Sequence, residues 1–268
     1  MFSIMFKNAV RKIVPKRYHP FLCKMRNFLI APINLIVYGG SEYSCPFCLH
    51  SFSRLLPAGL KDDILKEKKI IGGGYRENAV CPYCRSSDRD RLIYLSIKKN
   101  NLLKPNTTLL HVAPEANLSK FFRKLPIKYI SGDLKSHFAK AQIKMDIQDI
   151  PFQSDFFDSI ICNHVLEHIV DDKKAMRELY RVLKKGGWAI LQVPYSPTLK
   201  NTFEDSKITG KEERQKSFGQ WDHVRIYGKD YVARLKSVGF KVEQKKLDNP
   251  TTHKLALNTE ETIFFCRK

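Results

Sequence analysis

Residues 157–193 read FDSIICNHVLEHIVDDKKAMRELYRVLKKGGWAILQV. The runs at 157–162 and 188–193 are short, apolar and rich in Ile and aromatic residues, which is typical of buried strands. Between them, apolar residues recur at helical spacing over 172–183, and Gly186 and Gly187 follow as residues that end a helix. A strand, a helix and a second strand in this order predict a parallel β-α-β unit.

The same alternation continues on both sides of this unit. The expected strands are 108–112, 127–131, 142–146, 157–162, 188–193, 240–245 and 262–267, and the expected helices are 91–98, 117–124, 172–183 and 229–238. The last two strands are joined through a turn-rich segment at 248–258 and can pair antiparallel. The pattern predicts an α/β, Rossmann-like fold with a seven-stranded, mostly parallel sheet and helices on both faces.

Length and composition predict one large domain with a small satellite. The chain has 268 residues, of which 43% are hydrophobic, so it can bury a full core. We expect a basic amphipathic arm at 1–40, a zinc-ribbon-like module at 41–87 and the α/β domain at 88–268. The 47 Lys and Arg residues outnumber the 27 Asp and Glu residues and give a net charge of +20, which favours phosphate-rich surfaces such as RNA, anionic lipid or phosphorylated carriers.

The arm carries seven basic residues and no acidic residue before Glu42. Its most apolar stretch, 28–38, contains Pro32 and Asn34 and is only eleven residues long, whereas a membrane-spanning helix needs about 20. We therefore expect no transmembrane segment and no cleaved secretory signal. The arm is interpreted either as an interfacial helix on anionic membrane or as a helix packed on the body of the protein. The expected location is the cytoplasm, at the inner membrane surface if the arm binds lipid.

Two cysteine pairs predict a structural zinc site. Cys45-Pro-Phe-Cys48 and Cys81-Pro-Tyr-Cys84 enclose 32 residues, more than the roughly 15–20 of the commonest ribbon spacing, so the loop must carry structure of its own. Four thiolates fill the tetrahedral coordination of Zn²⁺ and leave no open position, which indicates a structural or docking role. A redox-active dithiol and two local disulfides are the alternatives, but the expected contexts for these are absent.

Acidic residues stand just after the second and third strands of the α/β domain, at the edge where ligands bind in open parallel sheets. Asp133 follows the second strand, and residues 146–152, DIQDIPF, follow the third. A carboxylate at the second position can accept both ribose hydroxyls of a nucleoside, and one at the third can accept an adenine amino group. Asp133 and Asp146 take these roles, with Ile147 packed on the adenine ring.

Three longer strings carry a family resemblance: 146–158 (DIQDIPFQSDFFD), 161–168 (ICNHVLEH) and 178–188 (ELYRVLKKGGW). They resemble the adenine loop, the fourth motif and the glycine turn before the fifth strand of class I S-adenosylmethionine (SAM)-dependent methyltransferases of the methyltransferase type 11 group. The resemblance covers about two thirds of the chain and implies that 88–268 binds SAM and transfers its methyl group. The string 218–228 (FGQWDHVRIYG) and the cysteine pairs look like one subgroup of this family.

The first motif departs from the family's pattern of an acid followed by a glycine-rich turn. This chain has His111, Ala113, Pro114 and Glu115 there. SAM presents an amino acid end where a dinucleotide presents phosphates, so glycines are not physically required, and Glu115 can accept the methionyl ammonium. His111, Ala113 and Glu115 are therefore expected cofactor contacts. The alternative is a degenerate fold that binds no SAM.

The resemblance also places Asn163 and His164 near the reactive methyl group, as cofactor contacts, with His164 a catalytic candidate. His164, Glu167 and His168 stand in the order HVLEH and not in that of the zinc motif HExxH. His168 is interpreted as a hydrogen-bonded histidine at a helix start.

The loop from Pro194 to Tyr227 is too long for a simple connection, and long loops at the ligand edge commonly bind substrate. Asp222 is expected to orient His223, which would accept a hydroxyl proton, and Arg225 to hold an acidic group of the acceptor. The alternative is a lid locked by internal salt bridges. The candidate substrate-binding residues are Tyr195, Trp221 and Arg225.

These observations predict an enzyme, a SAM-dependent methyltransferase that methylates an oxygen of a small molecule or of a cell-surface glycan intermediate. An RNA methyltransferase is the first alternative, in which the ribbon and the charge of +20 grip phosphates. A non-catalytic, zinc-bearing adaptor that keeps the methyltransferase fold is the second alternative.

Overall fold

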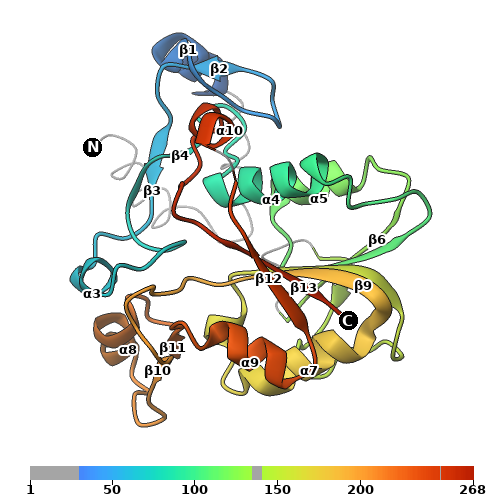
Figure 1. The fold of residues 1–268 in the computed structure, drawn as a ribbon. Coiled ribbons are helices and arrows are strands. Elements are labelled where there is room, and N and C mark those ends of the chain that lie inside the picture. The colour runs from blue at the N-terminus through green and yellow to red at the C-terminus, as the bar shows by residue number, and fades with distance from the viewer. Residues whose placement is uncertain (1–29, 135–140, 248) are drawn as a thin grey trace, which may run out of the picture.

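A seven-stranded sheet forms the centre of the computed structural model, which describes residues 30–134, 141–247 and 249–268 (Figure 1). The strand order is β12-β13-β9-β8-β5-β6-β7. The pairs β7–β6, β6–β5, β5–β8 and β8–β9 are parallel, whereas β13 is antiparallel to both β9 and β12. The strands are β5 (Thr108–Val112), β6 (Lys128–Asp133), β7 (Ile143–Lys144), β8 (Phe157–Asn163), β9 (Leu183–Gln192), β12 (Lys241–Lys245) and β13 (Ile263–Arg267). The predicted fold class, including the antiparallel pair at the C-terminus, is confirmed.

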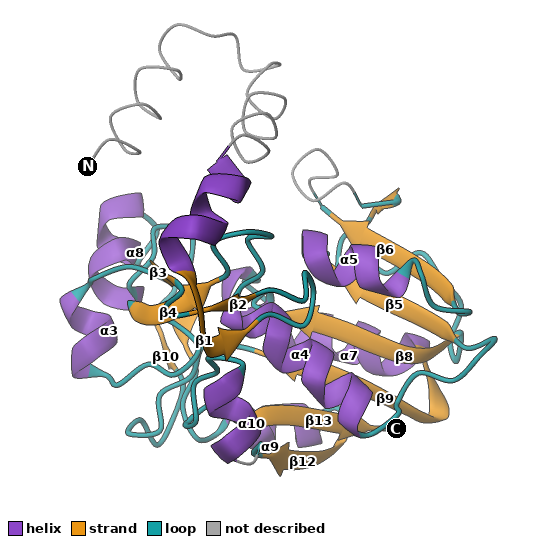
Figure 2. Cartoon of the chain, turned by 90° about the horizontal axis from the view of Figure 1, so that it is seen from above, coloured by secondary structure: helices purple, strands orange, loops and turns teal. Residues whose placement is uncertain are grey.

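Helices cover both faces of this sheet. Alternate side chains of each strand point to opposite faces, so one strand contributes to a core cluster on each side. Leu110 of β5 packs with the first core cluster, which contains buried residues of α7 (Asp172–Val182) and α9 (Tyr231–Ser237). Leu109 packs with the second cluster, which contains buried residues of α4 (Asp88–Lys99) and α5 (Ala116–Phe122). Figures 1 and 2 show α4 and α5 on one face and α7 and α9 on the other.

The two CxxC segments form matching turns. The amide of Leu49 donates to the carbonyl of Cys45 (2.9 Å), and the amide of Arg85 donates to that of Cys81 (3.1 Å). Leu49 and Arg85 both have positive φ, 62° and 64°, so each turn closes through a left-handed residue four positions after its first cysteine. The module's other elements are β1 (Gly39–Ser44), β2 (Ser51–Phe52), β3 (Leu56–Ala58), α3 (Asp63–Glu67) and β4 (Arg76–Val80), with β1–β2 and β3–β4 paired antiparallel.

Arg91 of α4 fastens this module to the α/β domain. Its side chain is completely buried. Its guanidinium donates to the carbonyls of Ser86 (3.0 Å) and Ala79 (3.1 Å) in the module, and to those of Leu255 (2.6 Å) and Ala256 (3.1 Å) near the C-terminus. Since a buried guanidinium needs all of its donors satisfied, this one side chain holds three distant segments together.

The two glycines after α7 do not end the helix, in contrast to the prediction. Helix α7 stops at Val182, and the extended strand β9 starts at Leu183, so Gly186 and Gly187 lie within the strand. Gly186 has a φ of +77°, and the pairing with β8 jumps from Phe157–Leu183 to Ser159–Trp188. The two glycines therefore make a bulge in the strand and do not cap the helix.

Segments predicted as loops also contain short elements. The long loop between β9 and α9 contains β10 (Phe203–Glu204), α8 (Lys211–Phe218) and β11 (Arg225–Ile226), and the turn-rich segment contains α10 (Asn249–Lys254). Asp171 accepts a hydrogen bond from the amide of Lys174 (2.8 Å) and caps α7. Asp172 lies inside the helix and pairs with Arg234 (3.0 Å).

Most of the predicted basic arm lies outside the described residues. Its last part, 30–38, is helical and leads into β1 (Figure 2). Asn34 donates to the carbonyl of Pro82 in the second cysteine turn (2.8 Å), while Ile33, Ile36 and Val37 are exposed. Within the described part of the chain, no helix is long and apolar enough to cross a membrane.

Candidate functional site

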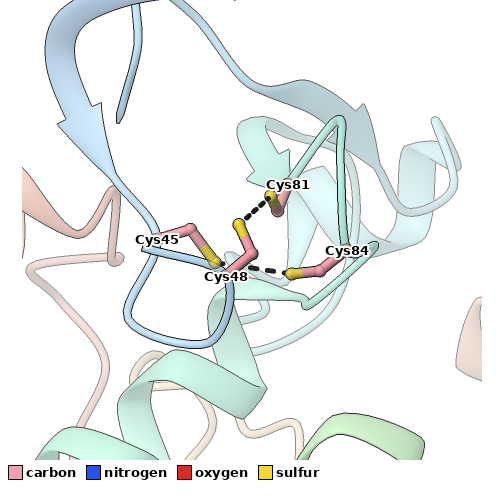
Figure 3. Close-up of side chains that lie close together, drawn as sticks. All are labelled: Cys45, Cys48, Cys81 and Cys84. Carbon is pink, nitrogen blue, oxygen red and sulfur yellow. Dashed lines mark hydrogen bonds between the residues drawn. The ribbon is translucent and has the colours of Figure 1, made fainter. Parts of the chain in front are cut away.

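The four predicted zinc ligands face one another (Figure 3). The Sγ atoms of Cys45 and Cys84 lie 3.5 Å apart, and those of Cys48 and Cys81 lie 3.7 Å apart. These separations are far longer than a disulfide bond of about 2.05 Å. They match the roughly 3.8 Å between corners of a tetrahedron with Zn–S bonds of about 2.3 Å. The cluster is consistent with a small zinc site, and its thiols are free of disulfides.

A separate cavity of about 500 Å³ opens at the carboxyl ends of β5 and β8, where the strand order of the sheet reverses. Its walls include the turns after β5 and β8, the ribbon-module loops around Gly59 and Gly73, the start of α4, and the end of α8 with the loop that follows it. The ribbon module therefore contributes directly to the wall of the cavity.

Glu115 supplies negative charge to this cavity from the N-cap of α5. Its Oε2 lies 2.6 Å from Nε2 of His111, and its Oε1 accepts a hydrogen bond from Nδ2 of Asn163 (3.0 Å). Burial alone raises the pKa of Glu115, but the contacts with His111 and Asn163 lower it below its ordinary value. The group is thus an anion held in a fixed orientation.

His111 itself does not reach the cavity. Its ring is completely buried and is held between Glu115 and the hydroxyl of Tyr129, which lies 3.0 Å from Nδ1. The predicted cofactor contact at His111 is therefore corrected to a positioning role for Glu115. Ala113, a predicted cofactor contact, lines the cavity and has a φ of 47°, so its backbone makes the sharp turn that glycine makes more easily.

Arg89 and Arg76 supply positive charge to the same cavity, and the sequence reasoning missed both. Arg76 Nη2 lies 3.1 Å from a carboxylate oxygen of Asp88, so its charge is balanced. Arg89 donates through Nη2 to the carbonyl of Gly72, and its Nε is buried without a hydrogen-bond partner. An unused buried donor on a cation is suited to an anionic ligand group.

Asn163 and His164, which are predicted cofactor contacts, line the cavity at the end of β8. The Oδ1 atom of Asn163 and the Nδ1 atom of His164 are buried without hydrogen-bond partners. Burial, followed by the charge of Arg89, lowers the pKa of His164, so its imidazole is neutral at neutral pH and retains a lone pair. His164 has a φ of 53°, which turns the chain sharply after the strand.

Asp222 does not orient His223, in contrast to the prediction. The Oδ2 atom of Asp222 lies 3.4 Å from Nδ1 of His168, and its carbonyl oxygen lies 3.1 Å from the same nitrogen. His168 and His223 have ring centroids 4.7 Å apart, and both line the cavity. Burial lowers the pKa of His223 to about 4. With Glu167, the two histidines form a cluster whose nitrogen and oxygen atoms lie within 4.8 Å of one another.

Arg225 is committed to internal contacts, although it touches the cavity wall. Its Nε lies 2.7 Å from a carboxylate oxygen of Glu204, and its Nη atoms donate to the carbonyls of Leu166 (3.1 Å) and Val170 (2.8 Å). Glu204 also pairs with Arg234 (3.0 Å). The structure therefore supports the alternative of a lid locked by salt bridges, and the predicted contact of Arg225 with an acceptor is corrected.

Neither Tyr195 nor Trp221 lines the cavity, so their predicted substrate contacts are not supported. Tyr195 packs edge-on against Phe264 with ring centroids 5.4 Å apart. Trp221 is 51% exposed and lies under the ammonium of Lys211, 5.3 Å from the ring centroid.

The predicted adenosine contacts do not line this cavity but lie farther along the same edge of the sheet. Asp133 ends β6, the neighbour of β5, and Asp146 follows β7, the next strand. Asp146 Oδ1 accepts a hydrogen bond from the amide of Gln148 (2.8 Å). Ile147 is 4% exposed and packs in the core, so its predicted stacking on adenine is corrected.

Residues 112–191 match a protein family described as "Methyltransferase domain". An uncharacterized protein of Methanocaldococcus jannaschii is 31% identical over 46% of this chain and 60% of that protein. The chloroplastic 2-methyl-6-phytyl-1,4-hydroquinone methyltransferase of Arabidopsis thaliana is 29% identical over 54% of this chain and 36% of that protein. The chain thus spans less than two thirds of these relatives. A crystal structure of a SAM-dependent methyltransferase from Archaeoglobus fulgidus is 12% identical, with a TM-score of 0.46, over 69% of this chain and 96% of that one.

Proposed function

Because the chain carries a class I methyltransferase domain, we propose that the protein binds SAM and transfers its methyl group to an oxygen atom of a small-molecule or glycan acceptor. The observation that carries this proposal is the pair of opposite charges in the cavity. The amino acid end of SAM is a zwitterion. Glu115 presents an ordered carboxylate, and Arg89 presents a buried donor without a partner, in walls of the same cavity.

The adenosine end is assigned to the adjoining strand ends. Asp133 at the end of β6 binds the ribose hydroxyls, and Asp146 after β7 binds the adenine amino group. In this assignment the two ends of SAM follow the order of the strands along the sheet. The amino acid end lies over β5 and β8, and the nucleoside lies over the next two strands.

When bound, SAM supplies an activated methyl group, so the protein's own task is to align the acceptor and to remove its proton. We assign proton removal to His164, because Nδ1 of this neutral imidazole is buried in the cavity wall without a partner. The ribbon-module loops and the loop that contains α8 both contribute walls to the cavity. A cavity walled in this way favours a compact acceptor over an extended RNA strand.

Incubation of a cell extract with the enzyme and methyl-labelled SAM, followed by mass spectrometry, tests the activity and names the acceptor. The wild type is expected to label a small molecule or a glycan, and Glu115→Gln is expected to lower the labelling about tenfold or more by removing one charge-assisted contact. Glu243→Gln, at a 51% exposed glutamate, serves as the control. Labelling of RNA alone would instead support the RNA methyltransferase. An absence of labelling, together with an absence of SAM binding, would support the adaptor.

The cysteine cluster is assigned one structural Zn²⁺, held by Cys45, Cys48, Cys81 and Cys84. Fixing the two turns also fixes the loops between them, which line the cavity. We further propose that the protein acts in the cytoplasm and that the arm, whose last helix exposes Ile33 and Ile36, attaches it to anionic membrane.

A further inference from the structure

We propose that Glu167, His168 and His223 form a second metal site, which binds a divalent cation in the wall of the cavity. The donor atoms of these three residues lie within 4.8 Å of one another, and all three residues line the cavity. The site is separate from the cysteine cluster and differs from it chemically. A further step, in which the bound cation holds the methyl acceptor, rests on the proposed function. Binding of the cation itself does not.

The backbone brings the three ligands together. Glu167 and His168 lie in the 3₁₀ helix Leu166–His168, and His223 lies in the loop before β11. The amide of Val224 donates to the carbonyl of Glu167 (2.9 Å), so the two segments are joined next to the ligands. The lid contacts of Arg225 with Leu166 and Val170 fix the same junction from the other side. The cluster is thus built by the fold and does not depend on mobile surface side chains.

Glu167 provides the independent sign that a ligand belongs here. Its side chain is 2% exposed, and its Oε2 is buried without a hydrogen-bond partner. Its Oε1 lies 3.6 Å from Nδ1 of His164, beyond hydrogen-bond distance, and that nitrogen is also without a partner. A buried carboxylate with an unused oxygen is costly, and a cation bound to that oxygen removes the cost.

His168 has the second contact that metal-binding histidines commonly have. Its Nδ1 lies 3.1 Å from the carbonyl oxygen of Asp222, which can only accept a hydrogen bond, so Nδ1 carries the proton. The Nε2 atom then keeps the lone pair that binds a metal. The side-chain carboxylate of Asp222, 3.4 Å from the same Nδ1, strengthens this choice of tautomer.

The donor set indicates which cations fit. Two imidazoles and one carboxylate suit Zn²⁺, Mn²⁺, Fe²⁺ or Co²⁺ and leave coordination positions open, unlike a site closed by four thiolates. Those positions face the cavity into which we place the acceptor. The site therefore narrows the acceptor class to molecules with adjacent oxygen donors, such as a vicinal diol or a hydroxycarboxylate, which can chelate a divalent ion.

Mn²⁺ is a suitable probe because it prefers oxygen and nitrogen ligands and does not compete for thiolates. The full-length protein is freed of loosely bound ions and titrated with Mn²⁺, with calorimetry and electron paramagnetic resonance as readouts. The wild type is expected to bind one Mn²⁺ per chain in addition to the zinc of the cysteine cluster. Glu167→Gln and His223→Asn are expected to weaken binding at least about tenfold. His253→Asn, at a 65% exposed histidine, is the matched control and should bind like the wild type.

Two further readouts keep the outcomes distinct. Co²⁺ added to the wild type should give d–d absorption without new thiolate-to-metal bands, which identifies nitrogen and oxygen ligands without any substitution. Circular dichroism and binding of S-adenosylhomocysteine report whether each variant is folded, independently of the metal. If the wild type binds Mn²⁺ but not S-adenosylhomocysteine, the result counts against the proposed function and leaves the metal site standing. An absence of Mn²⁺ binding to the wild type, or equal binding by folded Glu167→Gln, would overturn the metal site.

Discussion

Glu261 is a buried carboxyl group near Arg89, Arg76 and Asp88. Burial raises its pKa from 4.5 to about 7, because the nearby arginines only partly offset the loss of water. The folded protein therefore keeps a proton that the unfolded chain releases between pH 4.5 and 7, so stability from this group falls as the pH rises through that range. Relative to Glu261→Gln, the wild type should lose up to about 3 kcal/mol of unfolding free energy between pH 4.5 and 7.

Urea unfolding of both proteins at several pH values in this range measures the difference. Glu260→Gln, at the exposed neighbouring glutamate, is the control and should track the wild type. Parallel stability curves for the wild type and Glu261→Gln would show that the buried carboxyl group does not titrate in this way.

The candidate site residues that line the cavity include those at or just after the ends of β5 and β8. Ala113, Glu115, Asn163 and His164 all line the cavity, because a strand's end fixes where the next side chains lie. Arg89 instead lies in α4, which precedes β5, and it reaches the cavity only because of how α4 packs on the sheet. The predicted partner of Asp222 was also wrong. His223 is its neighbour in the sequence, but folding of the loop places Asp222 beside His168.

Gly59 is a test at the scale of an element, the loop between β3 and α3. It has a φ of +94°, and a Cβ atom added there would lie 1.6 Å from the carbonyl oxygen of Gly74. The two loops pack backbone to backbone and both line the cavity. Gly59→Ala should therefore lower the unfolding free energy by at least about 2 kcal/mol, from backbone strain and overpacking together.

Gly186→Ala is the matched control, because Gly186 also has a positive φ (+77°) but has open space where a Cβ would be placed. It should cost only about 1 kcal/mol, from the left-handed conformation alone. Chemical denaturation compares the two variants. Equal losses would mean that the ribbon-module loops do not pack as described.

Long elements were predictable and short ones were not. The expected helix 172–183 has clear helical periodicity, and the expected strand 108–112 is a short run that is buried throughout; they agree closely with α7 and β5. Helix α8 has only Phe218 buried and therefore shows no apolar face in its sequence. Its start is set instead by Glu213, whose carboxylate accepts from the amide of Gly210 (3.1 Å).

At the scale of the whole molecule, the ribbon module and the α/β domain share one cavity. From the sequence we expect only a structural or docking role for the ribbon module. Arg91 joins them through a buried guanidinium, and Arg76 and Gly74 of the module line the same cavity as Glu115. No local pattern predicts such a contact, because it arises from packing between segments far apart in the chain.

Binding of SAM between the ribbon module and the α/β domain is tested most directly by calorimetric titration of the full chain with S-adenosylhomocysteine. We predict one site per chain, with affinity about tenfold or more lower in Glu115→Gln and unchanged in Glu243→Gln, at an exposed glutamate. An absence of binding heat with the wild type, or equal affinity in Glu115→Gln, would contradict it.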